Sequence, residues 1–242
     1  MNASEGEKSV TFVLVHGGWH GGWCWKKFTP LLQATGHTVL TPTLTGMGER
    51  AHLLNPEIDL DLHIQDIVAV LEYEDLREVV LVGHSYGGMV IAGVAERATE
   101  RLAHLVYLDA FLPENGKALQ DYAFLPPTRD DDGWRVLPYT GSPGMFGVTD
   151  ERDLAWMEPR IGDQPIKTFT QPLPRSADFH PTLPQTFIQC SDAPFFVEAA
   201  DRARRYGFHF YALSGAGHDA MITQPQELTL LLRHIVAAPS LT

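Results

Sequence analysis

The chain alternates short, continuously apolar runs with longer segments in which apolar residues recur every three or four positions. The apolar runs predict strands over residues 10–15, 37–44, 79–82, 102–108, 186–190 and 208–213. The longer segments predict helices over residues 24–35, 60–73 and 194–205, a buried helix after residue 85, and a last helix over residues 224–236 that opens with a capping box of Thr223 and Gln226. Strands and helices alternating across short loops are typical of an α/β domain. Its mostly parallel sheet, here of about six strands, carries helices on both faces.

This rhythm breaks between residues 111 and 185. Eleven of the 17 prolines and nine aromatic residues fall in this stretch. A long irregular insertion is typical of a lid or binding wall, whereas a poorly ordered loop would contain few aromatics. We therefore expect a core of residues 1–110 and 186–242 and a cap of residues 111–185, with short helices near residues 119–124 and 150–157. The cap side chains expected to line an apolar pocket are Phe124, Trp134, Phe146, Trp156 and Met157.

Composition narrows the classes of partner. The net charge of −12 argues against binding to nucleic acid or to an anionic membrane surface. Residues 1–8 are polar and no apolar run is long enough to span a bilayer, so we expect neither a secretory leader nor a membrane anchor. Cys24 and Cys190 lie in apolar surroundings and are interpreted as packing residues. These features predict a cytoplasmic protein without a metal or another cofactor.

The candidate nucleophile is Ser85, which follows the apolar run of residues 79–82. Glycines two residues before and after it, Gly83 and Gly87, complete a G-x-S-x-G pattern between a predicted strand and a predicted helix. The glycines permit a turn so tight that side chains beside the serine would collide. A nucleophile elbow of a serine hydrolase is therefore predicted, the alternative being a glycine-rich turn with an uninvolved serine.

A serine nucleophile needs a base and an acid that orients the base. His218 follows the last predicted strand in a loop of small residues, which is the position expected for the base. Two aspartates each lie just after the end of a predicted strand. Asp192 follows the penultimate strand and is the favoured acid, while Asp109 follows the strand after the elbow and stays as the alternative. Asp219 adjoins the histidine in sequence and points elsewhere, because neighbouring side chains diverge.

The donors for the oxyanion are expected to be backbone N–H groups. One is that of Tyr86, directly after the nucleophile. The other comes from the loop His16-Gly17-Gly18 after the first strand, where Gly17 is also expected to adjoin the substrate. His16 itself is interpreted as a structural hydrogen-bonding residue.

Three segments carry a resemblance to a known family: residues 13–23 (VLVHGGWHGGW), 81–89 (LVGHSYGGM) and 215–221 (GAGHDAM). They resemble the α/β-hydrolases that include plant methylesterases, hydroxynitrile lyases and bacterial esterases. The resemblance implies the α/β-hydrolase fold, Gly18 as the second oxyanion donor, and Asp192 as the acid. Relatives often carry one more residue between the strand cysteine and this aspartate.

The resemblance also separates two reactions. Lyases of the family are similar in having a threonine after the loop histidine and a lysine after the catalytic histidine. This chain has Gly17 and Asp219 there, and a negative charge would oppose the release of cyanide. We therefore expect a serine carboxylic-ester hydrolase that acts on a small to medium apolar alkyl or aryl ester, as a monomer or homodimer. The alternatives are a hydroxynitrile-lyase-type enzyme and a non-catalytic small-molecule receptor.

Overall fold

Six parallel strands form one sheet in the order β2-β1-β3-β4-β7-β8. They are β1 (Thr11–Val15), β2 (Thr38–Leu40), β3 (Val79–His84), β4 (Leu102–Leu108), β7 (Gln185–Gln189) and β8 (His209–Ala212). The computed structural model describes residues 9–124, 127–129, 131–138, 146–174, 176, 179 and 181–237. The stretch Met1–Lys8, on which the expectation of no leader rests, lies outside these residues. The predicted α/β class and six-stranded parallel sheet are confirmed.

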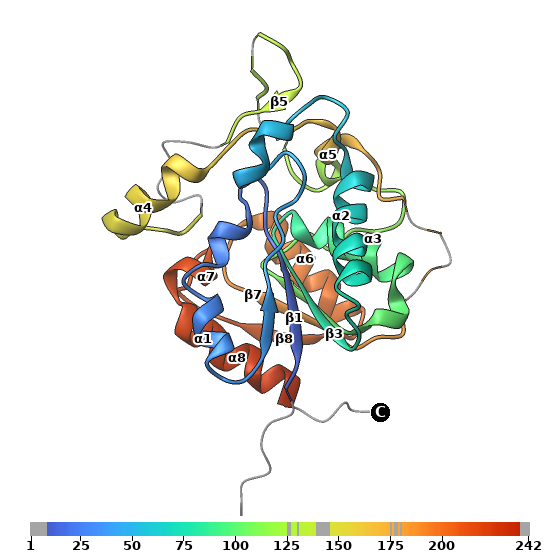
Figure 1. The fold of residues 1–242 in the computed structure, drawn as a ribbon, viewed down its shortest axis with the longest axis vertical. Helices are drawn as coiled ribbons and strands as arrows, with labels where there is room; N and C mark the ends of the chain where they lie inside the picture. The colour runs from blue at the N-terminus through green and yellow to red at the C-terminus, as the bar shows by residue number, and fades with distance from the viewer. Residues whose placement is uncertain are drawn as a thin grey trace, which may run out of the picture.

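Helices cover the sheet on both sides. In Figure 1, α2 (Leu60–Tyr73) and α3 (Gly87–Arg97) lie together on one side of the strands, and α1 (Thr29–Gln33) and α8 (Pro225–Ala237) lie on the other. The helix α6 (Pro194–Arg205) packs against β7 and β8. Short helical turns complete this part of the fold: η1 (Gly22–Trp25), η2 (Gly48–Leu53), η3 (Thr99–Arg101) and α7 (Ala220–Thr223).

Three local predictions were wrong for identifiable reasons. The helix expected over residues 24–35 is a 3-10 turn followed by the short α1, because Pro30 cannot donate the hydrogen bond that a continuous helix requires. The strand expected over residues 37–44 ends at Leu40, two residues before Pro42. Thr223 does not take the N-cap position of α8, because it is the last residue of α7 and α8 begins at Pro225.

The segment from residue 111 to 185 contains its own small elements. The strands β5 (Arg135–Val136) and β6 (Gln164–Pro165) pair antiparallel, and α4 (Glu151–Met157) begins at the N-cap Asp150. The other pieces are α5 (Lys167–Thr170), η4 (Leu119–Asp121) and η5 (Glu158–Arg160). Figure 1 shows β5, α4 and α5 at one end of the molecule, beyond the strands. Both cysteines are free and buried, as expected of packing residues. Among the described helices, none combines the length and apolarity that crossing a membrane requires.

Gly88 in the first turn of α3 allows this helix to touch the segment after β4. A Cβ atom at this position would lie 2.0 Å from the carbonyl oxygen of Phe111. We expect Gly88→Ala to destabilise the fold by about 1–3 kcal/mol, because backbone cannot move aside cheaply. In a thermal melt this corresponds to about 2–4 °C per kcal/mol for a chain of this size. Gly162→Ala is the matched control, since nothing lies within 4 Å of its added Cβ. Equal melting temperatures for the two variants would refute the claim that the close approach to Phe111 requires glycine at position 88.

Candidate active site

Ser85 stands at a strained turn between β3 and α3. Its φ angle is +53°, a region that residues other than glycine seldom adopt. The flanking glycines are required by contact: a Cβ at Gly83 would lie 2.6 Å from the carbonyl oxygen of Gly87, and one at Gly87 would lie 2.8 Å from that of Val15. The backbone oxygen of Ser85 accepts the N–H groups of Gly88 and Phe111 at 3.0 and 3.1 Å. The turn therefore has the form of the predicted nucleophile elbow, with Ser85 partly exposed to a cavity of about 850 Å³.

His218 lines the same cavity as Ser85 and is held by a carboxylate on its far side. Its Nδ1 donates to Asp109 Oδ2 at 2.7 Å. The ring stacks on Phe196 with centroids 4.5 Å apart, and the ring of His84 lies 4.4 Å away. With Nδ1 donating its proton, Nε2 is the nitrogen left to act as a base.

Asp109 is fully buried and satisfied on every side. Besides the bond from His218, it accepts the N–H groups of Cys190 (2.8 Å) and Ser191 (3.1 Å) and the Ser191 hydroxyl (2.6 Å). Burial alone would raise the pKa of Asp109, but the hydrogen bond and charge of His218 and the bonds from Ser191 and Cys190 outweigh it and lower the pKa. The carboxylate is therefore ionised and fixed, as the orienting acid of a base must be.

The preference for Asp192 as the acid is corrected by this geometry. His218 is bonded to Asp109, whereas Asp192 is an exposed residue that lines the cavity. The physical reason lies in the loop after β7. Its first two backbone N–H groups and the Ser191 hydroxyl turn inward onto Asp109, so the chain leaves the sheet before it reaches Asp192.

The loop after β1 presents the predicted oxyanion donors. Gly18 and Tyr86 both line the cavity, and within the described residues no acceptor is found for their backbone N–H groups. His16 Nδ1 donates to the oxygen of Gly17 at 2.8 Å, and His16 Nε2 accepts from Leu44 N–H. The oxygen of Gly17 and the N–H of Gly18 belong to one peptide, so this bond fixes the direction of the donor. Burial lowers the pKa of His16 to about 3, and the ring is a neutral structural group, as predicted.

Two further contacts fix this loop. Gln164 of β6 accepts the N–H of Trp19 at 2.8 Å, so the segment predicted as a cap holds the loop directly. Gly17 does not line the cavity. A Cβ there would lie 2.8 Å from Nδ1 of His84 and 2.9 Å from Cβ of Ser85, so its role is close packing of the loop on the elbow.

The cavity wall differs from the predicted one. Phe124 and Phe146 line it, but Trp134, Trp156 and Met157 do not. Trp156 packs edge-on against Trp23, and Met157 is buried in the core. Aromatic residues outside the predicted set also line it: Trp19, Phe111, Phe169, Phe195 and Phe196. Four of these five lie a few residues beyond a strand end or next to a helix start, which is a signal the sequence offered.

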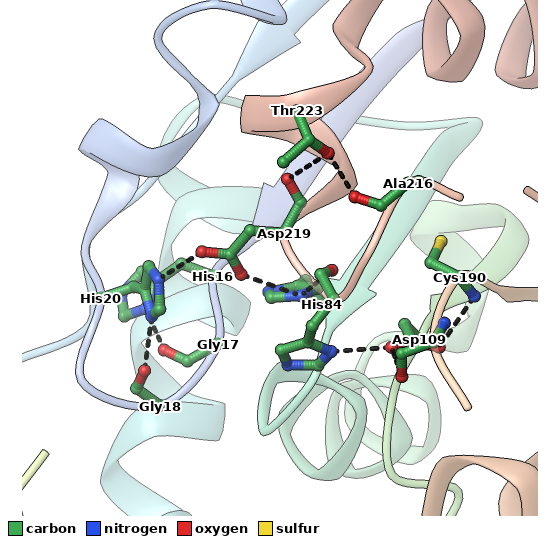
Figure 2. A network of polar contacts seen from close by, with 12 residues as sticks. His16, Gly17, Gly18, His20, His84, Asp109, Cys190, Ala216, Asp219 and Thr223 are labelled. Carbon is green, nitrogen blue, oxygen red and sulfur yellow. Dashed lines mark hydrogen bonds and ion pairs between the residues drawn. The ribbon is translucent and has the colours of Figure 1, made fainter. Parts of the chain in front are cut away.

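A buried polar network joins Asp219, the residue after His218, to His20 and His84 (Figure 2). Asp219 is fully buried and accepts from His20 Nε2 at 3.0 Å, and His84 Nε2 donates to the carbonyl oxygen of His218 at 3.1 Å. Asp219 does not line the cavity, so its charge does not face a leaving group there as the sequence argument assumed. Among the described residues, His84, His218 and Asp219 form the one group close enough to hold a metal ion, yet His218 and Asp219 already bond to Asp109 and His20.

Comparisons with known proteins show what the chain as a whole is similar to. A family model described as "Alpha/beta hydrolase family" matches residues 12–229. The chain is 37% identical to a carbendazim hydrolyzing esterase of a Nocardioides strain, over 90% of this chain and 96% of that protein. It is 28% identical to salicylic acid-binding protein 2 of Nicotiana tabacum, over 93% and 96%. The solved structure of the methylesterase MES16 from Arabidopsis superposes with a TM-score of 0.75 at 25% identity, over 94% of this chain and 99% of that one.

Proposed function

Because the chain belongs to the α/β-hydrolase family, we propose that it is a serine carboxylic-ester hydrolase that works through an acyl-enzyme on Ser85. The observation that carries the proposal is the 2.7 Å bond from His218 to the buried Asp109, with His218 and Ser85 lining one cavity. The esterases and methylesterases among the relatives agree with the reaction predicted from the sequence. The catalytic triad is proposed as Ser85, His218 and Asp109.

The reaction proceeds in two halves. Ser85 Oγ passes its proton to His218 Nε2 and attacks the ester carbonyl, and the resulting oxyanion is held by the N–H groups of Gly18 and Tyr86. Each such donor contributes about 2.7–4 kcal/mol of transition-state stabilisation. His218 then protonates the leaving alcohol. A water molecule, deprotonated by His218, attacks the acyl carbonyl and releases the acid and free Ser85. Asp109 stays ionised throughout and stabilises the imidazolium.

The cavity supports an apolar ester of moderate size. Eight of the 21 residues that line it are aromatic, and its volume of about 850 Å³ is in the range of small-molecule sites. A non-catalytic receptor remains the second candidate, because one relative is named as a salicylic acid-binding protein. The lyase is disfavoured because Gly17 and Asp219 occupy the positions where the lyases are similar in having threonine and lysine. We also propose a cytoplasmic monomer or homodimer.

Turnover of defined compounds tests the proposal. We expect hydrolysis of p-nitrophenyl acetate and butyrate, with carbendazim as a further substrate to try because a relative hydrolyses it. Mandelonitrile is expected to release no cyanide above the uncatalysed background. Cyanide release that depends on Ser85 would favour the lyase. Thermal stabilisation by an ester or acid without any product, including no burst, would favour the receptor.

A further inference from the structure

His20 joins two loops that the proposed reaction uses. It lies in the loop after β1 and is 1% exposed. Its Nδ1 lies 2.6 Å from the oxygen of Gly18, and its Nε2 lies 3.0 Å from Oδ2 of Asp219 (Figure 2). Gly18 belongs to the oxyanion loop, and Asp219 follows the base His218 directly in the chain. The imidazole of His20 therefore contacts both the oxyanion loop and the residue that follows the base.

The bonding pattern of His20 fixes its protonation. Both of its partners are acceptors, a carbonyl and a carboxyl group, so the His20–Asp219 pair must hold a proton in addition to the one on Nδ1. Burial opposes a charge on either residue, but the attraction and hydrogen bond between them raise the pKa of His20 and lower that of Asp219. The extra proton therefore resides on His20, and the pair is an imidazolium with a carboxylate.

The surroundings hold this pair rigidly. The His20 ring stacks on Trp23 with centroids 5.2 Å apart and meets the edge of Phe146 at 5.0 Å. Asp219 N–H donates to the oxygen of Phe146 at 2.8 Å. The other titratable groups that face His20 are His16 and His84, both of which burial keeps neutral, with the pKa of each lowered to about 3. No second charge competes with Asp219 for His20 among these described neighbours.

We propose that the His20–Asp219 ion pair positions the oxyanion donor Gly18 relative to the base His218. The proposal rests on the proposed function of Ser85 and His218. His20 and Asp219 are positioning residues, because neither lines the cavity.

Asp219 lies beside the base as well as beside His20. A carboxylate oxygen of Asp219 and a ring nitrogen of His218 lie within 4.8 Å of each other. Loss of either member of the ion pair therefore disturbs the loop that carries His218 as well as the loop that carries Gly18.

Loss of either positioning residue, in His20→Gln or Asp219→Asn, is expected to change kcat rather than KM. Displacement of Gly18 or His218 by a fraction of an ångström lowers the rate, and we expect a 10- to 100-fold fall in kcat for each single variant with KM within about threefold. Rates are normalised to the fraction of active sites that react with an organophosphate. A loss of folded protein therefore does not lower the measured kcat. His52→Gln and Asp201→Asn, at exposed positions, are the matched controls and are expected to keep wild-type values.

A measurement without turnover separates this proposal from the esterase assignment. In protein labelled with 15N-histidine, NMR at pH 7.5 is expected to show a doubly protonated imidazole that disappears in His20→Gln and becomes neutral in Asp219→Asn. A neutral His20 in the wild type overturns the proposal even if esters are hydrolysed. Unchanged kcat in His20→Gln also overturns it. If the His20 imidazolium is present but no ester is hydrolysed, only the esterase assignment is rejected.

Discussion

Ser85→Ala is expected to lower kcat for p-nitrophenyl butyrate by roughly 10⁴- to 10⁶-fold, because no other group at the elbow can accept the acyl chain. KM is expected to change little, since the aromatic wall that contacts the ester is intact. The residual rate would come from the oxyanion donors and from binding alone. Initial rates over several substrate concentrations measure both constants.

The fold of this variant needs an independent check. Its melting temperature is expected to lie close to that of the wild type, and Ser9→Ala, which replaces a serine outside the cavity, is expected to retain full activity. Activity of Ser85→Ala within about tenfold of the wild type would reject Ser85 as the nucleophile.

Asp109→Asn is expected to lower kcat by about 10⁴-fold, the loss typical of a base that is held in the wrong tautomer. The amide offers one acceptor where the carboxylate accepts four hydrogen bonds, from His218, Cys190 and twice from Ser191. The NH₂ group would face at least one of these donors in a buried place, so a fall in thermal stability is also expected.

Asp192→Asn is the matched comparison for the same chemistry. Asp192 is exposed at the cavity, so the change is expected to alter kcat by no more than about threefold and to leave the melting temperature unchanged. Both variants are assayed at one pH with the same ester. A large loss for Asp192→Asn together with a small one for Asp109→Asn would restore the acid expected from the sequence.

The contrast between these two aspartates shows how much of a site can be predicted from the sequence. Ser85 and His218 are each tied to one element end, a glycine-bracketed turn and the last strand, and both lie in the predicted cavity. Which of the two strand-end aspartates serves as the acid depends on which of them the loop that carries His218 approaches. That choice depends on the path of residues 190–192, where the N–H groups of Cys190 and Ser191 turn onto Asp109. Such a path is a property of three loops together, and local pattern does not encode it.

The wall of the cavity and the network behind His218 were unpredictable for a similar reason. Periodicity identifies strands and long helices, but it carries no information on where an irregular insertion folds back. Trp156 therefore packs on Trp23, while Phe195 and Phe196, at the start of α6, line the site. His20 and Asp219 lie 199 positions apart in the chain, and they meet only because the loops after β1 and β8 fold toward each other.

Covalent labelling tests the central claim, an acyl-enzyme on Ser85, most directly. Protein is treated with an organophosphate or quenched during p-nitrophenyl butyrate turnover, and the adduct is located by peptide mass spectrometry. One adduct per chain is expected, on Ser85, formed in parallel with the loss of activity and absent from Ser85→Ala. An adduct on another residue, or hydrolysis that continues at full rate once Ser85 is blocked, would contradict it.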